Sequence, residues 1–322
     1  MTWLVTHTDV VAAAARIAPY VSHTPLLALP GLWVKPEGRQ PTGSFKVRGA
    51  VHALGRLRGV PAVVAQSSGN HGRAVAHAAR LFGLAATIVM PTSAPELKVA
   101  AVRALGARVV LAAPADRAAV AARLAEGACL VRADDPDVLA GHGTVGLEIL
   151  ADLPGVDTVV VPVGNGGLLA GVAVAVKTIS PRTAVIGVEP ELAADAAESM
   201  RLGRLVTWPT SATYRTVADG LRVPSLGSLA WEHVRAYVDD IVTVTEAEIA
   251  AAAGLLWTEL GERAEPSGAV ATAAHLAGRL PTGTCVAVLS GSNIAADDFA
   301  AFMTQAPVIA AARVPAGATP AG

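Results

Sequence analysis

Short apolar segments alternate with alanine-rich segments along almost the whole chain, and this alternation constrains the fold more than any other feature. The apolar segments are rich in Val, Ile and Ala, which is typical of strands buried on both faces. Between most of them lie ten or more residues with helical character, such as GRAVAHAARLFG at 72–83. The expected strands are 32–35, 62–66, 86–90, 108–112, 129–132, 158–163, 184–190, 241–245 and 285–290. Strands of this kind separated by helices predict an α/β fold with mainly parallel, twisted sheets covered by helices.

The length of 322 residues is sufficient for about two lobes. The alternation becomes weaker in GACLVRADDPDVLAGHGT at 127–144, where Asp, Pro and Gly cluster. Such residues favour turns and loops, so we predict a boundary between lobes near this segment. The final residues, ending AARVPAGATPAG, are rich in Pro, Gly and Ala, and we expect them to be frayed.

Composition excludes several classes of partner. The net charge is −1 and only 16% of residues are charged, which gives no electrostatic reason to expect nucleic acid or an anionic membrane as partner. The most apolar window, 159–176, is interrupted by Pro162, Asn165 and four glycines, so a strand, a turn and a helix explain it better than a membrane span. Two isolated cysteines and the lack of a signal-peptide pattern predict a cytoplasmic protein.

The segment QPTGSFKVRGA at 40–50 places Lys46 at an expected helix start, in a chain with only four lysines. Ser44 is the expected N-cap of this helix. A helix N-terminus and a buried position both lower the pKa of a lysine, which leaves a nucleophilic amine suited to a Schiff base. The alternative from these residues alone is an exposed lysine in the first helical turn.

The segment GNGGLLAG at 164–171 follows an expected strand and opens an expected helix. Glycines let the backbone approach a ligand, and a helix N-terminus favours an anion such as phosphate. A dinucleotide is one possible ligand, because Glu189 follows at the distance of a ribose-binding acid, although Leu169 stands where the third glycine belongs. A phosphorylated cofactor that needs a lysine is a second possible ligand. The remaining interpretation is a tight turn that binds no ligand.

Two further segments end strands with polar residues. Ser67, Ser68, Asn70 and His71 occur within five residues at an expected helix start, where hydroxyls and free N–H groups can bind a carboxylate. Ser290 ends an apolar strand and is followed by glycine, so its hydroxyl could face a ring nitrogen at the edge of a sheet.

Eight segments in this order and spacing resemble the pyridoxal-phosphate (PLP) enzymes of fold type II, the tryptophan synthase β-like family. They are QPTGSFKVRGA, SSGNHG, GHGTVGLEI, VPVGNGGLLAG, VIGVEP, TVADGL, EPSGA and LSGSN, between about residue 22 and about residue 300. The closest resemblance is to the serine/threonine dehydratase and serine racemase group. It implies a homodimer and a discontinuous large PLP-binding domain, 1–50 and 137–322, with a small substrate-closing domain, 51–136.

The resemblance assigns cofactor roles to individual residues. Lys46 would carry PLP, Phe45 would pack beside it, Asn70 would hydrogen-bond its phenolic oxygen, and Ser290 would meet its pyridine nitrogen. The residues implied to bind the phosphate are Gly164, Asn165, Gly166, Gly167 and Leu168. The residues implied to surround the substrate carboxylate are Ser67, Ser68, Asn70 and His71.

The implied reaction is α,β-elimination of L-threonine or L-serine, in which freed Lys46 removes the α-proton and the β-hydroxyl leaves. The products would be a 2-keto acid and ammonia. An amino-acid racemase is the main alternative, because Ser68 resembles the serine that faces Lys46 from the opposite side of the substrate. A β-replacement enzyme is disfavoured by SSGNHG, and a silent ligand-binding relative is disfavoured by intact Lys46, Asn70 and Ser290. A nucleotide-binding oxidoreductase is a more remote alternative.

The racemase-like branch also implies a divalent cation. Its ligands would be the carboxylates of Glu189 and Asp195 and the carbonyl of Ala193, a set of hard oxygens that suits Mg²⁺ or Ca²⁺. Three positions depart from the usual family motifs: Asn165 replaces a glycine, Ser292 replaces another, and His142 stands where glutamine is common. None of them removes a group with an implied catalytic role.

Overall fold

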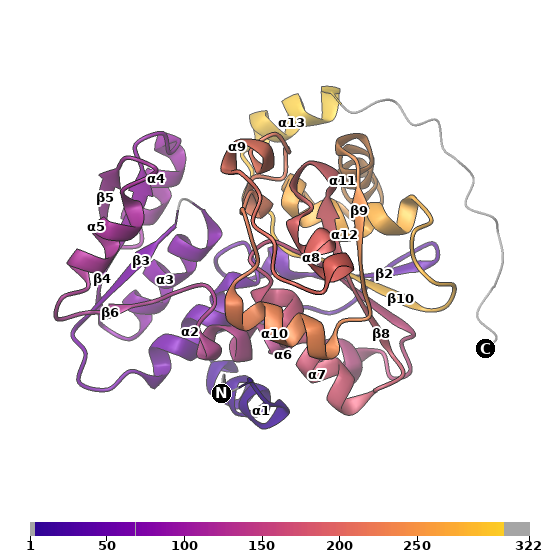
Figure 1. Ribbon diagram of the computed structural model, residues 1–322, viewed down its shortest axis with the longest axis horizontal. Helices are drawn as coiled ribbons and strands as arrows, with labels where there is room; N and C mark the ends of the chain where they lie inside the picture. The colour runs from indigo at the N-terminus through magenta and orange to yellow at the C-terminus, as the bar shows by residue number, and fades with distance from the viewer. Residues whose placement is uncertain (1–3, 68, 306–322) are drawn as a thin grey trace.

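The computed structural model describes residues 4–67 and 69–305, which form two parallel-sheet lobes beside each other (Figure 1). The strands are β1 (Leu27–Leu29), β2 (Leu32–Pro36), β3 (Ala62–Gln66), β4 (Ala85–Pro91), β5 (Arg108–Ala112), β6 (Cys129–Leu130), β7 (Thr158–Pro162), β8 (Ala184–Pro190), β9 (Asp240–Val244) and β10 (Cys285–Leu289).

The α-helices are α1 (His7–Ile17), α2 (Lys46–Arg56), α3 (Asn70–Leu81), α4 (Glu96–Arg103), α5 (Arg117–Leu124), α6 (Pro136–Asp152), α7 (Gly167–Ile179), α8 (Asp195–Leu202), α9 (Thr210–Thr213), α10 (Ser228–Tyr237), α11 (Glu246–Leu260), α12 (Pro266–Leu276) and α13 (Ala296–Gln305). Three short 3₁₀ helices are η1 (Glu37–Arg39), η2 (Glu191–Ala193) and η3 (Asp219–Leu221).

The large sheet has the order β1-β2-β10-β7-β8-β9, and all of its pairs are parallel except β1 with β2. Both faces are buried. Val159 and Val161 pack into a core with residues of α6, α7 and α10, whereas Val160 between them packs toward α11 and α12. This side-chain alternation of a doubly covered strand explains why β7 is apolar at almost every position.

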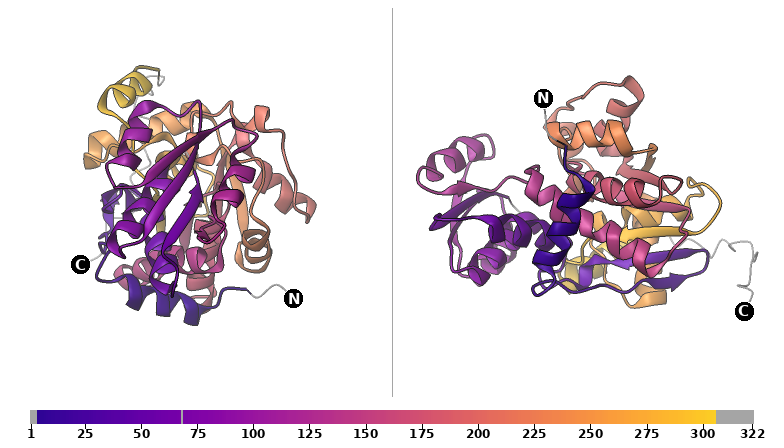
Figure 2. Two further views of the ribbon diagram at one scale, coloured as in Figure 1. Left: turned by 90° about the vertical axis from the view of Figure 1, so that its left-hand side faces the viewer. Right: turned by 90° about the horizontal axis from the view of Figure 1, so that it is seen from below.

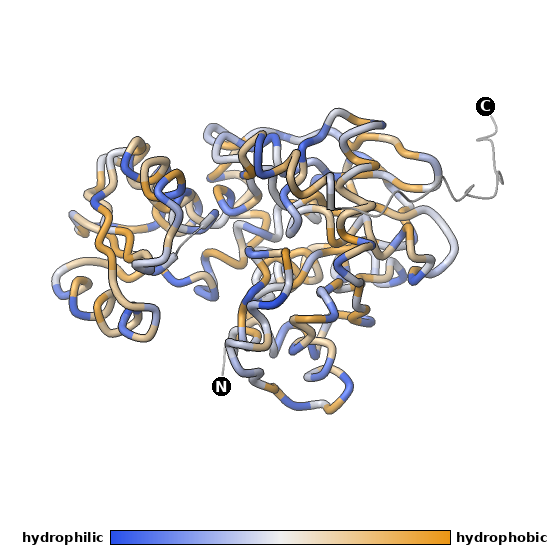
Figure 3. The backbone as a smooth tube through the Cα atoms, turned by 90° about the horizontal axis from the view of Figure 1, so that it is seen from above, coloured by the Kyte–Doolittle hydropathy of each residue, from blue (hydrophilic) through white to orange (hydrophobic). Residues whose placement is uncertain are grey.

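The small sheet has the order β5-β4-β3-β6, and all of its pairs are parallel. It lies at one end of the molecule, with its own helices on its faces (Figure 2). Residues of α2, α3 and α4 cover one face, and residues of α5 cover the other. Hydrophobic and hydrophilic segments alternate along the chain in both lobes (Figure 3), as expected for strands and helices that share buried layers.

The prediction of an α/β fold with mainly parallel sheets covered by helices is confirmed, and each of the nine expected strands is present within a few residues. Strand β1 was not expected. The predicted domain limits stay predictions. The limit between residues 136 and 137 falls at the start of α6, and the limit between residues 50 and 51 falls within α2. Ser68 and the C-terminal segment expected to be frayed lie outside the described residues.

Within the described ranges, no helix combines the length and the apolar character needed to cross a membrane.

Candidate active site

The candidate site lies where the carboxyl ends of strands from both sheets meet. Ser290 follows β10, Gly164 follows β7 closely, and Asn70 begins the helix after β3. The Phe45 N–H donates to the Ser290 carbonyl at 3.1 Å, which joins the start of α2 to the end of β10. The edge formed by the carboxyl ends of parallel strands is the usual ligand position in α/β folds.

Lys46 is the first residue of α2, as the sequence predicts. Its side chain is half-buried, and its Nζ lies 4.6 Å from the centroid of the Phe45 ring. Among residues 4–67 and 69–305, no carboxylate pairs with this amine. Burial lowers its pKa to about 8, because the charged form loses hydration without gaining a carboxylate partner.

The predicted N-cap role of Ser44 is wrong. The residue that precedes α2 is Phe45, and no side chain caps this helix. Ser44 instead forms an isolated antiparallel bridge with Gly291, and its buried Oγ has no partner among the described residues. Pairing with the segment after β10 fixes the Ser44 backbone, so its hydroxyl does not reach the free N–H groups of the first turn.

The glycine loop before α7 has a backbone that other residues would strain. Gly166 has φ = 84°, in the left-handed region, and a Cβ on it would lie 2.7 Å from Leu226 Cδ2. A Cβ on Gly167 would lie 3.1 Å from the Ala133 carbonyl oxygen. The Asn165 carbonyl accepts the Gly227 N–H at 3.0 Å, which holds the loop in place. The first N–H groups of α7 have no intrahelical acceptor, so they suit a phosphate.

Asn70 connects the small lobe to the large one. Its Nδ2 donates to Glu265 Oε1 at 2.6 Å, and its Oδ1 accepts from Asn293 Nδ2 at 2.7 Å. An amide NH₂ has two donors, so one N–H of Asn70 is left for a ligand oxygen. Burial, followed by the charge of Asp219, raises the pKa of Glu265 to about 7. Glu265 belongs to the motif EPSGA and Asn293 to the motif LSGSN, but sequence reasoning assigned neither residue a role.

Ser290 is buried at the end of β10, and its hydroxyl donates to the Ser267 carbonyl over a long 3.4 Å. Such a long bond is weak and easily exchanged for a better acceptor. A neutral ring nitrogen is such an acceptor, so the predicted contact with a pyridine nitrogen is chemically consistent with this environment.

The predicted carboxylate-binding residues lie at the start of α3. Ser67 Oγ accepts the Gly69 N–H at 3.2 Å. Burial and the charge of Lys46 lower the pKa of His71 to about 4, so this ring is neutral at pH 7. Its Nε2 lies 3.4 Å from the Val131 carbonyl; if Nε2 carries the proton, Nδ1 can accept a hydrogen bond but not donate one. Ser68 lies outside the described residues.

His142, the residue that replaces a usual glutamine, is fully buried beside Gly49 of α2 and Gly167 of α7. Its ring packs edge-to-face on Phe45 with centroids 4.7 Å apart, and neither ring nitrogen has a side-chain hydrogen-bond partner in the described part of the chain. Burial, followed by the charge of Lys46, lowers its pKa well below the usual value. A neutral imidazole therefore packs against the Phe45 ring.

Two of the predicted cation ligands, Glu189 and Asp195, lie close enough for their charges to interact, and the third, Ala193, ends η2 between them in the chain. Glu189 accepts the N–H groups of Ala196 and Ala197, while both Asp195 oxygens are buried without a partner among the described residues. Burial and the charge of Asp195 raise the pKa of Glu189 well above its usual value. Orphaned carboxylate oxygens fit a hard cation. No cluster of three or more His, Cys, Asp or Glu side chains suited to a metal occurs in residues 4–67 and 69–305.

These features together fit a phosphorylated cofactor with a carbonyl group. Lys46 supplies a desolvated amine, the loop before α7 supplies anion-binding N–H groups, and Ser290 and Asn70 supply polar groups for a ring. Gly166 and Gly167 let the loop lie against Leu226 and the Ala133 carbonyl, where any side chain would crowd these atoms.

Comparison with known proteins agrees with this fit. The chain is 45% identical over 275 residues to the L-threonine ammonia-lyase of Thermotoga maritima, a match that covers 82% of this chain and 67% of that protein. It is 39% identical over 317 residues to the serine racemase of Homo sapiens, a match that covers 91% of this chain and 92% of that protein. The crystal structure of a T.th. threonine deaminase superposes with a TM-score of 0.86 at 44% identity, over 90% of this chain and 99% of that one.

The family described as "Pyridoxal-phosphate dependent enzyme" matches residues 17–291, a range that contains Lys46, Asn70, the glycine loop and Ser290. The nucleotide-binding oxidoreductase alternative is therefore set aside. The chain belongs to the family of pyridoxal-phosphate dependent enzymes.

Proposed function

We propose that this enzyme eliminates the β-hydroxyl group of L-threonine or L-serine and so forms a 2-keto acid and ammonia. The observation that carries this proposal is the desolvated Lys46 amine at the start of α2, a helix start that is bonded through the Phe45 N–H to the end of β10. The similarity to a threonine ammonia-lyase and to a threonine deaminase supports the substrate class.

The roles of the residues follow from their surroundings. PLP, when bound, withdraws electrons from the Cα of an amino acid. Lys46, with a pKa of about 8, is poised to hold and to release a proton near neutral pH, which is what a general base requires. The N–H groups that begin α7 hold a phosphate, and the spare N–H of Asn70 orients a ring oxygen. A neutral Ser290 hydroxyl leaves a ring nitrogen unprotonated, which favours elimination over transamination.

The direct test incubates the purified, PLP-loaded enzyme with L-threonine and L-serine and follows keto acid and D-amino acid in one time course. Keto acid that forms faster than D-product supports the lyase. If neither product appears, the proposed substrates are wrong. Replacement of Lys46 by Ala should abolish turnover and the cofactor adduct that borohydride traps on this residue, whereas replacement of Lys177, which pairs with Asp239, should leave both unchanged.

Amino-acid racemisation is the second candidate, favoured by 39% identity to a serine racemase over 92% of that protein. The resemblance gives Ser68 the role of a second proton donor on the face opposite Lys46. D-serine that forms faster than pyruvate would establish this activity. Ser68→Ala should then remove D-serine formation and leave part of the elimination, since elimination needs a base on only one face.

We also propose that Glu189, Asp195 and the carbonyl of Ala193 bind Mg²⁺ or Ca²⁺. The two orphaned oxygens of Asp195 support this site, because an unpaired buried carboxylate is costly. Either cation should raise the midpoint of thermal unfolding relative to EDTA-treated enzyme, by the mass-action stabilisation that any native-state ligand gives. Asp195→Asn should remove this response, and Asp297→Asn on α13 should keep it. An equal response in all three proteins would exclude the site.

We propose further that the enzyme works as a homodimer in the cytoplasm. The resemblance supports the dimer, and the two free cysteines, Cys129 and Cys285, are compatible with a reducing compartment. Light scattering after size exclusion tests the dimer directly, since a mass near 32.5 kDa would identify a monomer.

A further inference from the structure

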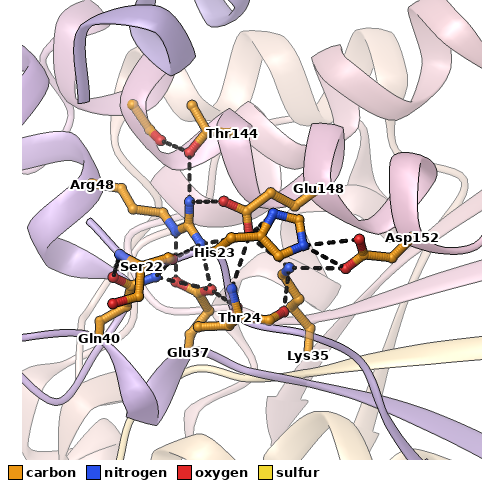
Figure 4. A network of polar contacts seen from close by, with 11 residues as sticks. Ser22, His23, Thr24, Lys35, Glu37, Gln40, Arg48, Thr144, Glu148 and Asp152 are labelled. Carbon is orange, nitrogen blue, oxygen red and sulfur yellow. Dashed lines mark hydrogen bonds and ion pairs between the residues drawn. The ribbon is translucent and has the colours of Figure 1, made fainter. Parts of the chain in front are cut away.

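Arg48 has the largest side chain among the fully buried residues of the described chain. Its guanidinium lies between two carboxylates (Figure 4). Nε and Nη2 donate to Glu37 at 2.7 Å each, and Nη1 and Nη2 donate to Glu148 at 2.7 and 2.9 Å. Nη1 also donates to Thr144 Oγ1 at 3.2 Å, and Nη2 to the Ser22 carbonyl at 3.3 Å. Every nitrogen of the guanidinium therefore has an acceptor.

These ion pairs connect α2, which packs on the small sheet, to two elements beside the large sheet. Glu37 directly follows β2, and Glu148 belongs to α6. Since an α-helix turns by about 100° per residue, the side chains of Lys46 and Arg48 point in nearly opposite directions. Directly before Lys46, the Phe45 N–H donates to the Ser290 carbonyl. The first turn of α2 is thus held by this backbone bond and by the Arg48 side chain.

The two cations at the start of α2 are in opposite electrostatic situations. Burial lowers the pKa of Lys46, which has no carboxylate partner in the described chain. Burial alone would also lower the pKa of Arg48, but Glu37 and Glu148 raise it above its usual value. Arg48 therefore stays charged at every pH at which the protein is folded. All of its N–H groups remain hydrogen-bond donors over that pH range.

We propose that Arg48 is a positioning residue for Lys46: it fixes the first turn of α2, and with it the amine, at one place in the site. The proposal rests on the cofactor-binding role of Lys46 but not on the substrate. Arg48 is saturated by its contacts with Glu37, Glu148, Thr144 and Ser22, so it acts on the site through the elements that it joins and not by binding a ligand itself. Loosening α2 lets water reach the amine and moves it from its place beside the Phe45 ring.

The test measures the reactivity of Lys46 itself in the full chain freed of cofactor. Reductive methylation with formaldehyde and cyanoborohydride over a pH series, followed by mass spectrometry of the Lys46 peptide, gives the titration midpoint of the amine. In the native protein this midpoint is expected near the pKa of about 8. The Arg48→Lys variant keeps the positive charge but loses the paired hydrogen bonds of the guanidinium to Glu37 and Glu148. In this variant we expect the titration midpoint of Lys46 to rise by about one pH unit or more, and the Kd for PLP to rise about tenfold.

Lys35 provides a matched control for general destabilisation. It is equally buried and belongs to the same cluster, with Nζ 2.6 Å from Glu148 and 3.6 Å from Asp152, but it lies on β2 and makes none of its polar contacts with α2. Lys35→Met should lower the unfolding midpoint while Lys46 still titrates near pH 8. The proposal would be overturned if the titration midpoint of Lys46 shifted equally in Arg48→Lys and Lys35→Met, or if it shifted in neither variant.

A milder variant covers the case in which Arg48→Lys does not fold. Glu37→Gln removes one of the two carboxylate charges on Arg48 and no direct contact of Lys35, since the side-chain partners of Glu37 are Arg48, Thr24 and Gln40. It should move the Lys46 midpoint in the same direction by a smaller amount. A Lys46 midpoint unchanged from the native protein would contradict the proposal. Turnover is not measured, so a wrong substrate assignment would leave this result intact.

Discussion

Lys46 shows how one residue obtains its chemistry from packing. At pH 7, a pKa of about 8 leaves about a tenth of this amine unprotonated, whereas a lysine in water is almost fully charged. The cause is desolvation, because no neighbouring charge of the described chain shifts the pKa of this amine as much as burial does. Phe45 beside the amine and His142 against Phe45 form a stack that excludes water from one side.

The pH dependence of cofactor capture follows from this shift. Only the free amine attacks a carbonyl group, so the rate at which PLP attaches to cofactor-free enzyme should rise about tenfold per pH unit below pH 8 and level off above it. Stopped-flow absorbance measures this rate. A rate that still rises through pH 10 would show that Lys46 titrates like an exposed lysine.

Residue-level motifs were informative where the chemistry is local. The sequence singled out Lys46, Asn70, Ser290 and the glycine loop as candidates because each belongs to a short motif at a strand end or a helix start. Ser44 received the wrong role, because a serine before a helix usually caps it. Here Ser44 pairs with Gly291, a residue far away in the chain, and that pairing is invisible in the local pattern.

At the scale of elements, α7 carries the proposed phosphate site. This buried, almost wholly apolar helix packs against α6 and α10, which fixes the place of its N-terminus in the fold. In the proposed site, the approach of a phosphate would depend on the conformation of the glycine loop, where Gly166 is in the left-handed region.

Gly166→Ala tests this dependence. Alanine at positive φ costs about 1–2 kcal/mol, and relaxation of the loop would move its N–H groups. We expect the Kd for PLP to rise roughly 5- to 30-fold, which fluorescence titration can measure. Gly203→Ala is the matched control: Gly203 also has positive φ, at 66°, but a Cβ there meets no atom within 4 Å. It should lower stability similarly without changing the Kd.

Strand β1 illustrates a limit of reading elements from sequence. It contains only three residues, Leu27–Leu29, joined to β2 through Pro30 and Gly31. Three residues are too few to display a periodicity of two. Its antiparallel pairing with Leu32 to Val34 creates the strand, so only the tertiary neighbour identifies it.

At the scale of the whole molecule, side-chain contacts join the small lobe to the large one across the site. Asn70 contacts Glu265 and Asn293, Arg73 donates to Asn293 at 2.7 Å, and Lys98 on α4 pairs with Asp219 of η3. Polar contacts of this kind are exchanged with water more easily than an apolar interface, so they are compatible with the proposal that the small lobe closes over a substrate.

Lys98→Met tests the contribution of an exposed contact of this kind. Both partners are more than a third exposed, at 37% and 38%, so the change in unfolding free energy should stay within about 1 kcal/mol. We expect the radius of gyration from small-angle X-ray scattering to increase as the small lobe opens. Arg103→Met, which breaks an ion pair within α4 itself, should not change it. Identical scattering of both variants would show that this pair does not hold the lobes together.

The sequence by itself determined the elements and the motifs, because strand burial, helix starts and glycine turns depend on neighbours a few residues apart. Only the tertiary structure decided the properties of the site. The lowered pKa of Lys46 requires burial, the Glu265 contact of Asn70 joins residues 195 positions apart, and Arg48 reaches a carboxylate 100 positions away. Desolvation and such long-range contacts exist only after distant segments pack together, so no local pattern contains them.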